Sequence, residues 1–286
     1  MFSRMSKLCL DILFLFVGLD VIPLRRSRDV RLSDAIKIQS FELVRDSASG
    51  SFDLSDVLSA TLVVIELDDL APEARETLIG QLLNEGELTR RDSFEHAQRR
   101  DSYTHGRLAA KIALQAHRSE IDPRLISIES GIFEQPILSN VAGASVSNLG
   151  VSISHSDRLA AALIFHRGHP MGIDVDLPSE DDVSPVLDGL DRETREMCAT
   201  IGLSKRDTAS LLWVARESLA KTLTTGMMTP LDIYAPSEIT HKVDHYVLGY
   251  RNFAQYQTYV WSGGSGWLAM TLPARTRFKN ERPEWS

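Results

Sequence analysis

The segment that most constrains how this chain of 286 residues can fold is 171–177, Met-Gly-Ile-Asp-Val-Asp-Leu. Successive side chains of a β-strand point to opposite faces of the sheet. Ile173 and Val175 therefore share one face, which can be buried, and Asp174 and Asp176 share the other. At the usual rise per residue, the two aspartates lie roughly 7 Å apart along the strand. The pattern predicts a strand with one apolar and one acidic face.

A later helical segment carries two further charged residues. Glu217 and Lys221 are spaced i and i+4, so they share one face of a helix. Ser204 fits the capping signal of this helix, and Gly226 is expected to end it. Each pattern alone has an ordinary interpretation, because acidic strand edges and surface Glu–Lys pairs are common, such a pair contributing about 0.2–0.5 kcal/mol. Together, three carboxylates and a lysine suit a hard cation and a diphosphate.

The rest of the chain predicts an α+β protein. Helices are expected at 72–83, 103–114 and 181–202, and strands at 61–67, 125–129, 151–156, 159–165, 231–234, 246–250, 256–261 and 267–272. The order of one strand, helices and further strands occurs twice, which favours two similar halves in tandem, 60–165 and 166–286. Residues 1–59 lack a clear period and are interpreted as a leader and linker.

Charge and cysteine content exclude several classes of protein. The formal net charge of −8 argues against broad nucleic-acid binding, which requires a basic surface. Cys9 and Cys198 form no CxxC pair, so a reducing compartment and a cytoplasmic location are expected. The apolar run 12–19 is too short to span a bilayer and no small-residue cleavage site follows it, so we expect neither export nor membrane association.

Three short motifs occur in a characteristic order. They are Ile-Ser-His-Ser at 153–156, Gly-Ile-Asp-Val-Asp at 172–176 and Trp-x-x-Arg-Glu-Ser-x-x-Lys at 213–221. In order and spacing they resemble the motifs of the Sfp-type 4'-phosphopantetheinyl transferases, over about residues 60–273. Enzymes of that family transfer the phosphopantetheine arm of coenzyme A to a serine of an apo carrier protein and release adenosine 3',5'-bisphosphate. The resemblance implies a pseudo-dimer of two α+β halves with coenzyme A in the cleft between them.

The resemblance also implies roles for individual residues. Asp174, Asp176 and Glu217 would bind Mg²⁺, with Mn²⁺ as an alternative metal, and Glu217 would be the candidate base for the carrier serine. Lys221 would bind the diphosphate and act in catalysis with Glu217. The residues expected to contact coenzyme A are His155, Ser154, Lys221, Arg90 and Arg107. The two arginines are less specific choices, because Arg107 shares a basic helical stripe with Arg100 and Lys111, and such a stripe is ordinarily a solvated helix face.

Three residues depart from the family pattern, and two alternative functions remain open. Arg216 replaces a common lysine, Asp176 replaces a common glutamate, and Gln135 replaces a lysine before Pro136. The alternatives are a non-catalytic homologue that binds coenzyme A or carrier, and a metal-dependent phosphohydrolase. The expected partners are coenzyme A and a carrier protein of fatty-acid, polyketide or nonribosomal-peptide synthesis. A monomer is expected, because a tandem pseudo-dimer needs no partner chain.

Overall fold

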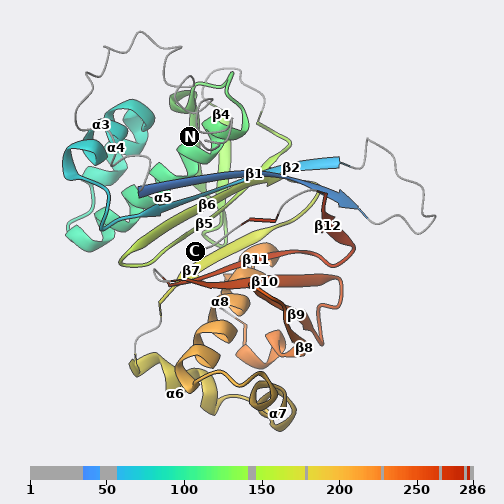
Figure 1. The fold of residues 1–286 in the computed structure, drawn as a ribbon. Helices are drawn as coiled ribbons and strands as arrows, with labels where there is room; N and C mark the ends of the chain where they lie inside the picture. The colour runs from blue at the N-terminus through green and yellow to red at the C-terminus, as the bar shows by residue number, and fades with distance from the viewer. Residues whose placement is uncertain are drawn as a thin grey trace, which may run out of the picture.

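The protein has four layers, in which two antiparallel sheets face each other and helices cover the outer face of each sheet (Figure 1). The computed structural model describes residues 35–45, 57–140, 146–177, 180–226, 229–263, 266–279 and 282–283. The described core has three parts, one between the sheets and one under each group of helices. Each sheet is therefore buried on both faces, which explains why its central strands are almost continuously apolar.

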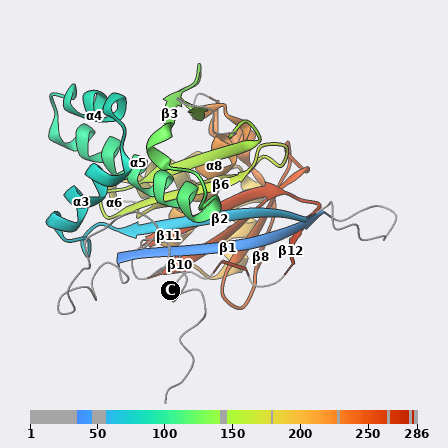
Figure 2. The same cartoon turned by 90° about the horizontal axis from the view of Figure 1, so that it is seen from above.

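The first half contains a five-stranded sheet and three helices. The strand order is β12 (Thr276–Phe278), β1 (Ile36–Arg45), β2 (Val57–Glu66), β6 (Leu159–His166) and β5 (Leu149–His155). The helices are α3 (Pro72–Leu82), α4 (Glu85–Asp92) and α5 (Ala97–His117), followed by the short helix η2 (Pro123–Leu125) and a separate hairpin, β3 (Ile126–Ser130) and β4 (Pro136–Asn140). Seen from above, α5 lies over the strands of this sheet, and α3 and α4 lie at the left (Figure 2).

The second half repeats this plan. Its sheet has the order β7 (Gly172–Asp176), β11 (Gly266–Pro273), β10 (Tyr256–Gly263), β9 (Tyr246–Tyr250) and β8 (Pro236–His241). The helices are α6 (Glu180–Asp188), α7 (Arg192–Ile201) and α8 (Lys205–Leu223), and the short helix η4 (Leu231–Tyr234) precedes β8. The structure thus confirms the expected α+β class with two similar halves.

The N-terminal boundary of the first half was predicted wrongly. Residues 1–59 were expected to be leader and linker, but β1 lies inside this range and pairs with β2 from Ile36↔Ile65 to Val44↔Val57. The pattern of β1 is irregular because it lies inside the sheet, between β2 and β12, and both faces contact other parts of the fold. Residues 1–34 and 46–56 lie outside the described residues.

Three further expectations need local correction. Residues 231–234 form the 3-10 helix η4 rather than a strand, and Pro230 precedes it directly. The predicted helix 181–202 is two helices, α6 and α7, with Asp191 as the N-cap of the second. Helix α8 begins after Ser204 as predicted but ends at Thr224, which adopts the left-handed conformation, rather than at Gly226.

No helix in the described ranges is both long and apolar enough to cross a membrane.

Candidate functional site

The two halves meet where β5, the last strand of the first sheet, lies beside β7, the first strand of the second sheet (Figure 1). Two serine side chains of β5 join these strands. Ser152 Oγ accepts a hydrogen bond from the Ile173 amide at 3.0 Å, and Ser154 Oγ accepts one from the Val175 amide at 3.2 Å. Sequence analysis did not single out Ser152, although the i, i+2 spacing of the serines places both on one face of the strand. These contacts fix the position of Asp174 between the halves.

Asp174 is the centre of a compact polar cluster at this junction. Its side chain is buried, and its Oδ1 accepts hydrogen bonds from Lys221 Nζ at 2.6 Å and from Ser154 Oγ at 2.7 Å. Lys221 Nζ also donates to Ser154 Oγ at 2.9 Å. The cluster therefore combines β5, β7 and the last turn of α8, and it confirms that the two motifs of the second half lie together in space.

Glu217 lies one turn before Lys221 on α8. Its Oε2 is 4.0 Å from Lys221 Nζ. Burial raises the pKa of Glu217, and the negative charges of Asp174 and Asp176 raise it further, while Lys221 opposes the shift. The three acidic side chains are therefore close enough to interact electrostatically. Asp176 lies at the end of β7, where its Oδ1 also accepts a hydrogen bond from the Leu177 amide at 2.8 Å.

The ligand chemistry of this cluster fits a magnesium ion. Carboxylate oxygens are preferred ligands of Mg²⁺. Asp174 Oδ2 is buried and has no hydrogen-bond partner in the described part of the chain. Among those same residues, however, no group of three His, Cys, Asp or Glu side chains is close enough to hold a metal as it stands. The metal-binding role of Asp174, Asp176 and Glu217 is thus still a prediction. To bind one ion, the three side chains would have to move closer to one another.

His155 follows Ser154 at the end of β5 and lies beside α5. Gly106 allows the close packing of α5 on β5, because an added Cβ there would lie only 3.0 Å from Ile153 Cγ2, and the His155 ring lies next to this contact. The residue reaches the surface, but loss of water around the ring lowers the pKa of His155, and the charge of Lys221 lowers it further. His155 thus lies within electrostatic range of the Asp174–Lys221 pair, as a contact for coenzyme A would require.

Arg90 and Arg107 form a different group in the first half. The Arg107 guanidinium stacks on the Tyr103 ring at 4.6 Å and donates to the Ile128 carbonyl at 3.0 Å. Arg90 is exposed on α4 and stacks on the Phe94 ring at 4.8 Å. The described contacts do not join either arginine to Lys221, so their role in binding coenzyme A is still a prediction.

Lys111 belongs to the same basic stripe in the sequence but is an interior residue. Its ammonium group is fully buried and pairs with the buried Glu87 carboxylate at 2.9 Å. It also donates to the carbonyls of Pro123 and Ile126. These contacts connect α4, α5 and the start of β3, so Lys111 stabilises the fold and is not available to a phosphate.

Two of the three residues that depart from the family pattern, Arg216 and Gln135, lie outside the polar cluster. The Arg216 side chain is only 3% exposed, and its Nε and Nη1 have no hydrogen-bond partner within the described ranges. Burial lowers the pKa of Arg216, and smaller electrostatic interactions, the largest of them with Tyr250, oppose this shift. Gln135 Oε1 accepts a hydrogen bond from the Phe133 amide at 2.9 Å and so closes the β3–β4 turn.

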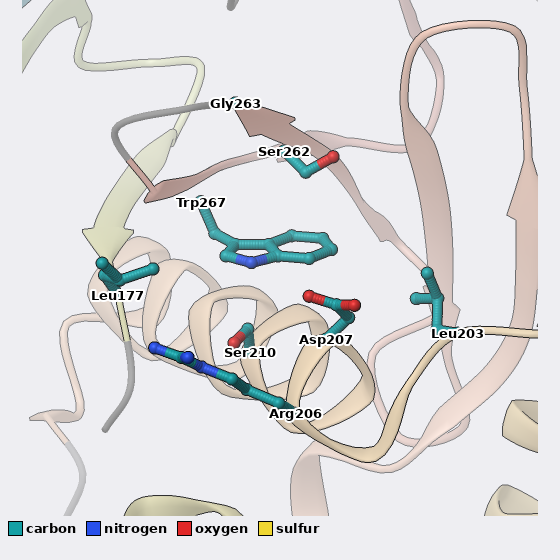
Figure 3. A pocket seen from close by; sticks show the side chains of 8 residues that line it. All are labelled: Leu177, Leu203, Arg206, Asp207, Ser210, Ser262, Gly263 and Trp267. Atoms are coloured by element: carbon teal, nitrogen blue, oxygen red, sulfur yellow. The ribbon is translucent and has the colours of Figure 1, made fainter. Parts of the chain in front are cut away.

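A cavity of about 450 Å³ opens near the acidic end of β7 (Figure 3). Leu177, which lines it, follows Asp176 directly, and Trp267 on β11 pairs with Asp176 in the sheet. Asp207 and Ser210 on the first turns of α8 face the Trp267 indole across the cavity (Figure 3). The cavity therefore lies between the end of β7 and the N-terminal turns of α8, and its lining residues do not include the members of the polar cluster.

Comparison with known proteins gives partial likenesses among solved structures. No family model matches the sequence, and no curated protein matches it. Among solved structures, the chain is similar to the holo-(acyl-carrier-protein) synthase from Bacillus anthracis str. Ames in complex with CoA (3',5'-ADP), at 23% identity. The likeness covers 37% of this chain and 91% of that chain, with a TM-score of 0.31. A likeness of this size carries no argument about function, which has to come from the side chains of this chain.

Proposed function

We propose that this protein is a Mg²⁺-dependent 4'-phosphopantetheinyl transferase that moves the phosphopantetheine arm of coenzyme A to a serine of an apo carrier protein. The observation that carries the proposal is the grouping of Asp174, Lys221 and Ser154 at the junction of the two halves. In the sequence these three residues belong to three separate motifs that resemble the family, and in the fold they lie within hydrogen-bonding distance of one another. Glu217 and Asp176 interact electrostatically at the same junction.

Each group of this cluster fits one requirement of phosphoryl transfer. The serine oxygen of the carrier attacks the β-phosphorus of coenzyme A, the bond to the bridging oxygen breaks, and adenosine 3',5'-bisphosphate leaves. Mg²⁺ bound by Asp174, Asp176 and Glu217 would neutralise charge on the diphosphate. The Lys221 ammonium would stabilise negative charge on the leaving phosphate. Glu217 would accept the serine proton.

His155 and the arginines of the first half would bind the rest of coenzyme A. A lowered pKa keeps the His155 imidazole largely neutral near pH 7. The ring can still donate one hydrogen bond to a phosphate oxygen. Arg90 and Arg107 would supply positive charge, since a guanidinium matches phosphate geometry with two parallel hydrogen bonds. The expected location is cytoplasmic, and the expected state is a monomer.

The test is the mass of the carrier. Incubation of the protein with coenzyme A, Mg²⁺ and apo carriers from several pathways is expected to add one phosphopantetheine group to at least one of them, detected by intact mass spectrometry. Asp174→Ala and Glu217→Ala are expected to abolish the mass gain, whereas Lys242→Ala, on an exposed turn, is expected to leave it unchanged. An unmodified carrier panel, or full activity of either acidic variant, would refute the proposal.

A further inference from the structure

Asp174 already has a counter-ion that the chain itself supplies. The Lys221 ammonium is 2.6 Å from Asp174 Oδ1, and the Asp174 side chain is only 6% exposed, so water screens the pair weakly. Ser154 reinforces this pair by donating to the same oxygen and accepting from the same ammonium group. One carboxylate oxygen of Asp174 is thus occupied by two donors, while its other oxygen, Oδ2, is buried and unpaired among the described residues.

This arrangement works against the binding of a metal ion alone. A divalent cation that approached Asp174 would be repelled by the ammonium group already on that carboxylate, and the repulsion is strong in a site with little water. The cation would also have to bring Asp176 and Glu217 closer, because no three potential ligands converge in the described structure. Both costs fall if Lys221 has another anion to bind.

We infer that Lys221 is an internal counter-ion for Asp174, and that its transfer to a diphosphate couples the binding of Mg²⁺ to the binding of coenzyme A. The inference rests on the proposed function for the identity of the diphosphate. When the diphosphate arrives, the ammonium moves to its oxygens and Asp174 becomes free to bind the metal. By linkage, each ligand raises the affinity of the other by the same factor.

Ser154 acquires a different role from the one that the resemblance implied. Its hydroxyl proton is donated to Asp174, and its oxygen accepts from Lys221 and from the Val175 amide. A hydroxyl group has one donor and two acceptor positions, so all of them are in use. Ser154 is therefore a positioning residue for the Asp174–Lys221 pair, and contact with coenzyme A would require it to give up one of these bonds.

Isothermal titration calorimetry of the full chain tests this coupling without measuring activity. MgCl₂ and coenzyme A are titrated separately and then each in the presence of the other. We expect coenzyme A to tighten Mg²⁺ binding by about tenfold or more, within the usual range for coupled sites. Equal Mg²⁺ affinity with and without coenzyme A would overturn the inference. This comparison uses only the wild-type protein, so it does not depend on whether any variant folds.

Substitutions of Lys221 identify the group responsible. Lys221→Gln keeps a hydrogen-bond donor but removes the charge, so it is expected to bind Mg²⁺ alone about tenfold more tightly than the wild type and to lose most of the coupling. Lys221→Arg keeps the charge and is expected to retain coupling. Lys205→Gln makes the same change at the exposed start of α8 and is expected to behave like the wild type.

The outcomes separate this inference from the proposed function. Unchanged Mg²⁺ affinity and coupling in Lys221→Gln would show that another group links the two ligands, and would refute the role of Lys221. Strong coupling with no modification of any carrier would reject the transferase and leave the counter-ion mechanism standing. A modified carrier without coupling would reject the mechanism alone.

Discussion

Replacing Lys111 by methionine tests whether the buried ion pair of the first half is a structural element. Lys111 is fully buried on α5 and contacts Glu87, whose side chain is 4% exposed. Methionine fills a similar volume but leaves the Glu87 carboxylate in the interior without its cation, which costs about 3–5 kcal/mol of unfolding free energy. The Pro123 carbonyl also loses a donor at 2.8 Å, so we expect a value in the upper part of this range.

The assay is urea unfolding at pH 7, with the double variant Glu87→Gln/Lys111→Met as the decisive comparison. Removing the stranded charge is expected to recover at least about 1 kcal/mol relative to Lys111→Met alone. Recovery stays partial, because Glu87 also accepts hydrogen bonds from the Asn84 and Ile128 amides. A loss below about 1 kcal/mol in Lys111→Met, as for an exposed ion pair, would refute the reasoning.

Three further variants test other parts of the account. Thr224→Gly is expected to raise the unfolding free energy by about 0.5–1 kcal/mol in urea, since Thr224 holds a φ of 56° that glycine adopts without strain. The hydrogen bond from Arg251 lowers the pKa of Asp191 from 3.8 to about 2. As the pH falls through this range, the unfolded state takes up a proton before the folded state does, so the free energy of unfolding decreases. Asp191→Ala is expected to flatten this part of the acid-unfolding curve. His155→Ala is expected to weaken coenzyme A binding, measured by calorimetry, by about tenfold or more, because the variant loses one hydrogen bond to a charged phosphate group.

The sequence was sufficient to predict the parts of the site that lie within one regular element. The strand that carries Asp174 and Asp176 and the helix that carries Glu217 and Lys221 form where their periodicity predicts. Periodicity succeeds there because each element buries one apolar face, that of β7 between the two sheets and that of α8 against the outer face of the second sheet. The closeness of Lys221 to Asp174 followed from the family resemblance, and the fold confirms it at 2.6 Å.

Contacts between distant elements could not be read from local patterns. Strand β1 was missed because its apolar alternation changes face within the strand: Ile38 packs under the helices, whereas Phe41 packs between the sheets. Lys111 looked like a surface cation because its partner, Glu87, lies on another helix. The serine contacts between β5 and β7 depend on the packing of two sheets that are separate in the sequence.

The most direct test of the proposed reaction measures adenosine 3',5'-bisphosphate release and carrier mass in the same sample. With Mg²⁺ and coenzyme A, the account predicts no release until an apo carrier is added, and then one bisphosphate for each phosphopantetheine group gained. Release without carrier would indicate a phosphohydrolase, and binding of both ligands without release would indicate a non-catalytic homologue. Either result would contradict the assignment of Asp174, Glu217 and Lys221 to phosphopantetheine transfer.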